Sequence, residues 1–175
     1  VSDQWMITDI NCSKSEMQQG AGEGQQIVVY YPNQQRQPDD ITDCGLVYGV
    51  ERNINNTENI YQKKLNELFK EPTDQEKDQG YSSFFSDQTK DILKQVKVDE
   101  ETAYVNLEDI REIIPLANSS CGSDQLISSI EETIKHNTSI EEVIIAIDGD
   151  PETFYEWVQI GCSEENNFCD PGPLE

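Results

Sequence analysis

The apolar residues of this chain gather in short runs of two kinds, and this pattern limits the fold more than any other feature. Residues 27–31 form a β-branched and aromatic run that Pro32 ends, which is typical of a strand. Residues 46–50 predict a second strand. Residues 92–98 and 102–107 predict a hairpin, and the uniformly apolar residues 143–147 predict a strand that is covered on both faces.

Two other segments carry apolar residues at helical spacing. The first stripe follows Asn56 and Thr57, either of which can cap a helix with Glu58 in its first turn, and it ends before Pro72. The second follows an expected loop at residues 118–122 and Ser123, a good N-cap residue. The stripes consist of Tyr61, Leu65, Leu68 and Phe69, and of Leu126, Ile127, Ile130 and Ile134. Because neither helix can bury its stripe alone, the two helices should pack on one face of a sheet.

The predicted fold class is therefore α+β, with a small mixed or antiparallel sheet and two amphipathic helices on one face. Residues 1–26 are expected to be an N-terminal extension and linker, because residues 13–26 are rich in Gln, Gly, Ser and Glu. Residues 27–160 form the predicted domain. Residues 154–160 are expected to be its last strand or helix, and residues 161–175 are expected to be a C-terminal tail.

The charge of the chain excludes one class of partner. Thirty-five acidic residues face twelve basic ones, which gives a formal net charge of −23. Such a field repels phosphate backbones and anionic lipids, so we expect no nucleic-acid binding. Charged partners should be basic proteins or cations.

The five cysteines favour an oxidising compartment over a metal site. None belongs to a C-x-x-C pair and the chain has a single histidine, so a zinc site is not expected. Cys162 and Cys169 bracket a polar loop and are the first candidate disulfide. Cys44 and Cys121 are the second, although connectivity does not follow from sequence and buried free thiols are the alternative. Cys12 is left over.

The sequence carries no catalytic constellation and implies no cofactor. His136 sits beside Lys135 at the expected end of a helix, where an exposed cation is the simpler interpretation. Carboxylates are so frequent that no pair stands out for glycosidase chemistry. The acidic segments 148–152 and 39–43 offer oxygen ligands for calcium, but neither has EF-hand spacing.

One ordered set of short motifs resembles a known family. It comprises Arg52 in the second strand, Pro-Thr-x-x-Glu at residues 72–76, Ala-Tyr-Val-Asn-Leu at 103–107, Thr133 in a helix, and residues 143–149 ending in Asp-Gly. In order and spacing this set resembles the GerMN domain, a module of spore-germination proteins and bacterial envelope lipoproteins. The chain departs from the family pattern at Glu71, where glycine is usual. It also lacks a proline near Phe85 and has a long loop after Asn33.

The resemblance implies structural roles for the motif residues. Arg52 is expected to pair with Glu76, and Thr73 is expected to cap a short helix that begins after Pro72, with Glu76 as its capping-box partner. Asp148 and Gly149 are expected to turn the chain after the buried strand.

The function expected from this resemblance is a non-enzymatic protein-interaction module of the bacterial envelope, located outside the cytoplasm. Its partner should be an envelope protein, and the sequence does not indicate an oligomeric state. No stretch is long and apolar enough to span a membrane. Because the chain starts at Val1 rather than at methionine, we expect that an export signal or a lipid-anchored cysteine preceded it. The alternatives are a secreted cell-wall hydrolase that uses a carboxylate pair, and a sensor of calcium or a small ligand.

Overall fold

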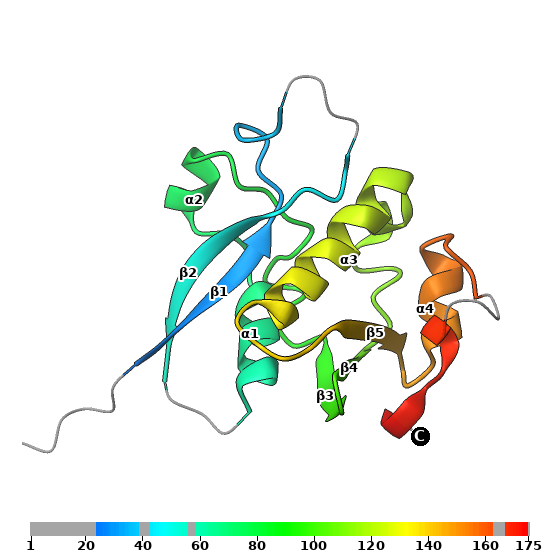
Figure 1. Ribbon diagram of the computed structural model, residues 1–175. Helices are drawn as coiled ribbons and strands as arrows, with labels where there is room; N and C mark the ends of the chain where they lie inside the picture. The colour runs from blue at the N-terminus through cyan, green and yellow to red at the C-terminus, as the bar shows by residue number, and fades with distance from the viewer. Residues whose placement is uncertain (1–23, 39–42, 56–58, 163–166, 175) are drawn as a thin grey trace, which may run out of the picture.

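Two small sheets and the helices between them make up the domain (Figure 1). The computed structural model describes residues 24–38, 43–55, 59–162 and 167–174. The first sheet pairs strands β1 (Gln25–Tyr31) and β2 (Tyr48–Ile54) in antiparallel fashion, with Ile27 opposite Arg52. Along β1 the side chains alternate, so Ile27, Val29 and Tyr31 are buried while Val28 and Tyr30 are only half-buried.

The second sheet has three strands in the order β3-β4-β5. Strands β3 (Leu93–Asp99) and β4 (Thr102–Leu107) form the predicted antiparallel hairpin, and β5 (Glu142–Ile147) runs parallel to β4. A parallel pair needs a long crossover, which helix α3 (Ser120–Lys135) supplies. The last five residues of β4 and of β5 are buried, so both strands are covered on their two faces.

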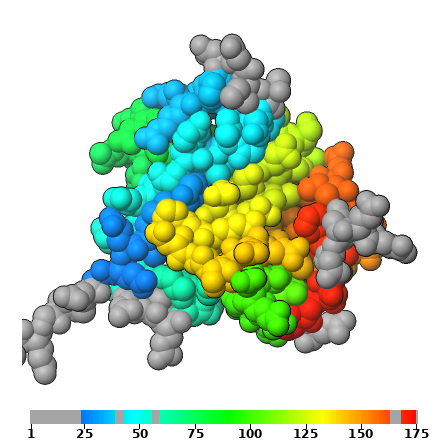
Figure 2. Space-filling model, viewed as in Figure 1, coloured from blue at the N-terminus to red at the C-terminus, as the bar shows by residue number. Residues whose placement is uncertain are grey.

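Helices α1 (Ile60–Leu68) and α3 lie between the sheets and contact strands of both, and they also contact each other. Figure 2 shows α3, in yellow, across the middle of one face, next to β1 in blue. The core beneath them combines both predicted stripes with the inward residues of the strands. The α+β class is therefore confirmed, but the strands form two sheets where the sequence suggested one.

The edge of β1 that faces away from β2 is covered by a helix. The backbone N–H of Tyr30 points away from β2 and donates to the side-chain Oγ1 of Thr133 in α3, at 3.0 Å. A helix therefore covers the edge that a further strand would otherwise have joined. Thr133 is fully buried, which explains why a polar residue stands in the apolar face of α3.

Two predicted helix starts differ from the structure. Helix α1 is capped by the side chain of Asn59, which accepts from the N–H of Gln62, while residues 56–58, the predicted start, lie outside the described residues. Helix α3 starts at Ser120 with Ser119 as N-cap, so the prediction of a loop at 118–122 and a cap at Ser123 is wrong. A methyl group on Gly122 would stand 2.3 Å from the Leu116 carbonyl, so this glycine allows the preceding turn, η1 (Pro115–Asn118), to pack on α3.

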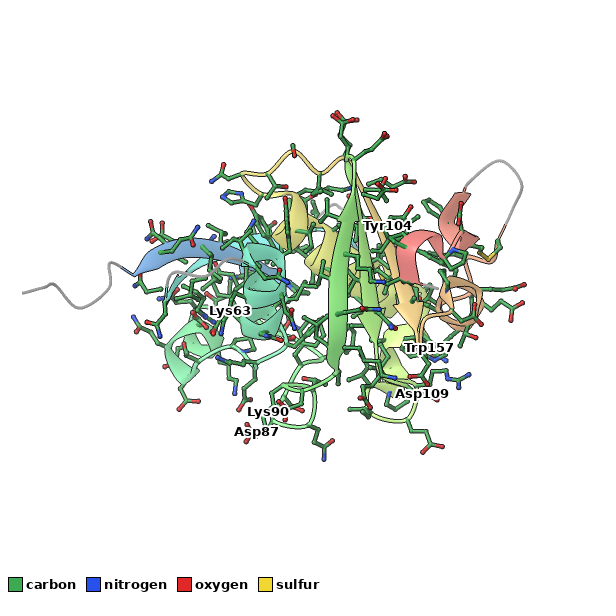
Figure 3. All side chains as sticks on the ribbon, turned by 90° about the horizontal axis from the view of Figure 1, so that it is seen from below. Lys63, Asp87, Lys90, Tyr104, Asp109 and Trp157 are labelled. Atoms are coloured by element: carbon green, nitrogen blue, oxygen red, sulfur yellow. A yellow bond between two sulfur atoms is a disulfide. The ribbon has the colours of Figure 1, made fainter. Side chains whose placement is uncertain are left out.

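The remaining elements are short. Helix α2 (Asp74–Asp78) follows Pro72. The last predicted element, which was expected to be a strand or a helix, is the helix α4 (Pro151–Trp157). The described C-terminal residues, with the turns η2 (Asn167–Cys169) and η3 (Gly172–Leu174), do not extend away as a tail but pack on the domain. Gly172 lies against the ring of Tyr104, which is labelled beside this segment in Figure 3.

Candidate functional site

Three groups of polar residues are the candidate sites of this fold: the Arg52 cluster, the Asp148 turn and the Lys64 cluster. The Arg52 cluster joins β2 to α2. The guanidinium of Arg52 pairs with both carboxylate oxygens of Glu76, with Nη2 and Oε2 2.7 Å apart. Their side chains are only 16% and 13% exposed, so the pair is largely removed from water.

Glu76 has a second task in the same cluster. Its Oε2 accepts from the backbone N–H of Thr73 at 2.8 Å, while the Thr73 hydroxyl accepts from the N–H of Glu76. This is a capping box at the start of α2, next to the buried Pro72. Burial acts to raise the pKa of Glu76, but the hydrogen bonds from Arg52 and Thr73 outweigh it and hold the pKa below its usual value. The carboxylate therefore stays charged and engaged on two sides.

The Asp148 turn follows β5 and is held by β4. Asp148 and Gly149 both have positive φ, 53° and 87°, which glycine adopts without strain. The N–H of Gly149 donates to Oδ1 of Asn106 at 2.7 Å, and Asp148 forms an ion pair with Lys94. The asparagine of the Ala-Tyr-Val-Asn-Leu motif thus fixes the turn of the Asp-Gly motif.

The acidic segment 148–152 also provides the N-cap of the next helix. Asp150 caps α4 by accepting from the N–H of Glu152 and from the Thr153 hydroxyl. Within the described residues, no group of three or more His, Cys, Asp or Glu side chains is arranged to hold a metal ion. Of the second calcium candidate only Asp43 is described, and it accepts from the N–H of Gly45.

The Lys64 cluster lies at the C-terminal end of α3. Lys64 is buried, and its Nζ donates to the carbonyl of His136 at 2.6 Å and to that of Ile134 at 3.4 Å. These carbonyls are at the negative end of the helix, where a cation is favoured. The cluster borders a hollow of about 500 Å³ between β1, α1 and residues 136–138. Sequence reasoning missed Lys64, although its spacing of three residues from Tyr61 and four from Leu68 places it beside the apolar stripe, unlike its exposed neighbour Lys63.

His136 belongs to the same cluster. Its Nε2 lies 3.0 Å from the side-chain nitrogen of Asn137, and its Nδ1 lies 2.8 Å from the Tyr30 hydroxyl. These contacts hold the turn after α3 against β1. In the described part of the chain, the hydrogen-bond partners of the ring do not include the serine or cysteine that a hydrolytic triad needs.

The described residues contain two disulfides, one between segments far apart in the sequence and one within a short loop. Cys44 and Cys121 form a disulfide that joins the residues before β2 to the first turn of α3, 77 positions later. Cys162 and Cys169 form a second disulfide that closes a short loop. Cys12 lies outside the described residues. None of the helices in the described ranges has both the length and the apolar character of a membrane span.

A comparison with protein families decides the identity. Residues 28–153 match the model of the family described as "Germane: Sporulation and spore germination". The chain belongs to this Germane family. The match runs from β1 into α4, so it includes both sheets, the Arg52 cluster and the Asp148 turn, while the C-terminal residues that pack on Tyr104 lie beyond it.

A solved structure agrees with the Germane fold. It contains the tandem GerMN domains of the sporulation protein GerM from Bacillus subtilis, and it matches with a TM-score of 0.50 at 16% identity. The match covers 84% of this chain and 43% of the GerM structure, so this chain spans less than half of that protein. The comparison with curated proteins finds no match. The GerMN resemblance is thereby confirmed.

The buried position of Lys64 predicts how stability depends on pH in this Germane domain. Burial lowers the pKa of Lys64 from 10.5 to about 8. A lysine whose pKa is lower in the folded state than in the unfolded state destabilises the fold. This penalty is complete at pH values below the folded-state pKa, and it shrinks as pH rises from the folded-state pKa toward the unfolded-state pKa. Between about pH 7.5 and pH 9.5 we expect the free energy of unfolding of the wild type to rise by ~2 kcal/mol relative to Lys64→Met.

The exposed neighbour supplies the control for this measurement. Urea denaturation at several pH values should show no such relative rise for the wild type against Lys63→Met, because Lys63 is exposed. A difference between wild type and Lys64→Met that stays constant over this pH range would contradict the assignment.

Variants of Thr133 test whether its hydrogen bond to Tyr30 protects the edge of β1. Thr133→Val keeps the shape but leaves the N–H of Tyr30 without its acceptor, so we expect a loss of ~1–2 kcal/mol in the free energy of unfolding. The amide hydrogen of Tyr30 should also exchange faster with solvent. Thr133→Ser keeps the hydroxyl and should retain the slow exchange. Equal exchange rates in the valine and serine variants would show that this bond does not protect the strand edge.

Proposed function

We propose that this Germane-family chain is a non-catalytic protein-interaction module that works outside the cytoplasm, in the envelope of a bacterium. One observation carries the proposal: the polar residues of the family motifs form their hydrogen bonds and ion pairs with other residues of the same domain. Arg52, Thr73 and Glu76 bind one another, and Asn106 holds the turn at Gly149. Residues used in this way build a scaffold, and the scaffold leaves the outer surface to carry specificity.

The disulfides support the location. Four of the five cysteines are paired, and paired cysteines persist in exported proteins while the cytosol keeps thiols reduced. The net charge of −23 supports a protein partner, because it disfavours nucleic acids and anionic lipid surfaces.

The test uses the protein expressed from its complete gene in its own host. Cells are converted to protoplasts and treated with protease and with a membrane-impermeant thiol reagent after reduction. We expect the domain to be cleaved and its cysteines to be labelled while a cytosolic marker stays intact. A domain that is protected until the protoplasts are lysed would overturn the proposed location.

A second experiment separates the interaction module from the hydrolase alternative. Purified cell walls are incubated with the protein, and the release of soluble sugar and peptide fragments is measured. We expect no release above that of a heat-denatured sample, because the described residues show no desolvated carboxylate pair. Release that depends on native protein would overturn the non-catalytic assignment.

A further inference from the structure

We infer that the partner of this module binds at one acidic, apolar surface, and that the partner presents basic residues around apolar side chains. This surface, here called the Leu116 surface, consists of Ile113, Leu116, Trp157 and Ile160. The inference rests on the proposed interaction function, for which it supplies the site and the chemistry of the partner.

The apolar residues of this surface are unusual for the chain. Four large hydrophobic side chains are classed as exposed in the described ranges, and three of them are Ile113, Leu116 and Ile160, at 36%, 73% and 46% exposure. The fourth, Val98, lies on β3 and is 43% exposed. Isolated apolar residues on a surface need no explanation, but a group of them marks an interaction site.

The two segments that carry this group lie side by side. The side-chain nitrogen of Gln159 donates to the carbonyl of Asn118 at 2.9 Å, which joins the end of α4 to the turn η1. In the last turn of α4, Trp157 and Glu156 line a shallow hollow together with Arg111. Figure 3 shows Trp157 and Asp109, two positions before Arg111, on the same side of the molecule. Residues 111–118 and 153–160 are thus neighbours at two places, and the four apolar residues lie on these two segments.

The fold holds Leu116 in a fixed position. Around the turn η1, Ile114 and Ala117 are buried in the core, while Ile113 and Leu116 point outward. Pro115 fixes its own backbone φ, and the turn packs closely against Gly122 of α3. Because the backbone that carries Leu116 is already held in place, binding of a partner costs little backbone entropy at this position.

The charges around this face select a basic partner. Glu112, Asp124 and Glu156 are exposed, and no ion pair involving them is found among the described residues. The nearby cation, Arg111, is already bound to Asp109 in a two-point contact of 2.7 and 2.8 Å. The net charge of −23 adds long-range attraction for cations. A basic rim on the partner would complement these carboxylates.

A synthetic peptide tests the surface directly. The probe is an 18-residue amphipathic helix made of leucine and lysine, titrated into the protein in calorimetry at about 150 mM salt. Leu116→Ser combined with Ile160→Ser should weaken binding at least about tenfold, because these side chains supply the apolar contacts. Val98→Ser is the matched control and should bind within about twofold of wild type. Thermal unfolding verifies that each variant is folded.

Equal binding by wild type and the double variant would contradict the assignment of the Leu116 surface as the binding site, because the peptide would then be attracted by net charge alone. Photo-crosslinking in the native host distinguishes this failure from a failure of the interaction function. A crosslinker is placed at position 116 or at position 98 of the full-length protein. Adducts of a basic protein from position 116 alone support the inference, and adducts from position 98 alone overturn the surface but leave the interaction function standing. No adduct from either position counts against both.

Discussion

Replacing Cys44 and Cys121 with serine is expected to lower the free energy of unfolding by ~4 kcal/mol. The bridge spans 77 positions of sequence, and in the chain-entropy account a longer closed loop restricts the unfolded chain more strongly. The bond also ties the residues before β2 to the first turn of α3. Urea denaturation measures the change.

The second bridge is the matched control for this prediction. Cys162 and Cys169 are seven positions apart, so replacing both with serine should cost ~2 kcal/mol. Cys12→Ser is introduced into every variant so that no free thiol can exchange. A larger loss from the short loop than from the long one would show that chain entropy does not govern these bridges.

Arg52→Met is expected to lower the free energy of unfolding by ~3 kcal/mol at neutral pH. Methionine fills a similar space but leaves the carboxylate of Glu76, only 13% exposed, without its cation. An uncompensated charge in such a place is costly. Glu76→Gln also leaves the Arg52 guanidinium, 16% exposed, without its anion, but the amide oxygen of the glutamine can still accept from Thr73 or Arg52, so this variant should cost less, ~2 kcal/mol.

The pH dependence adds a second check on Arg52→Met. Because the folded-state pKa of Glu76 is lowered, its contribution to stability is complete above the ordinary carboxyl pKa and is lost as pH falls through the folded-state value. The penalty of Arg52→Met should therefore shrink on acidification, as the lone carboxylate takes up a proton. Denaturation curves between about pH 3 and pH 7 measure this. A penalty that grows toward low pH would be inconsistent with the pairing.

The strands and helices of this domain were predictable because their signals are local. The alternation in residues 103–107 and the stripe around Leu65 depend only on neighbours in sequence, and the structure has a strand and a helix there. The capping box of Thr73 and Glu76 also depends on a short pattern, Pro-Thr-x-x-Glu, whereas the pairing of Arg52 with Glu76 was implied by the family resemblance.

The features that sequence reasoning missed depend on contacts between distant residues. Helix α3 covers the edge of β1 through the bond between Tyr30 and Thr133, which are 103 positions apart. The C-terminal residues pack on the domain, where Gly172 lies against Tyr104. No local pattern contains these contacts.

A double-mutant cycle on Arg52 and Glu76 tests the central claim most directly, namely that the family motif builds a scaffold. The free energies of unfolding of wild type, Arg52→Met, Glu76→Gln and the double variant are measured by urea denaturation. We expect a coupling energy of ~2 kcal/mol, with the double variant more stable than the sum of the single losses predicts. A coupling below ~0.5 kcal/mol would show that the pair does not support the fold, and the motif would then need another function.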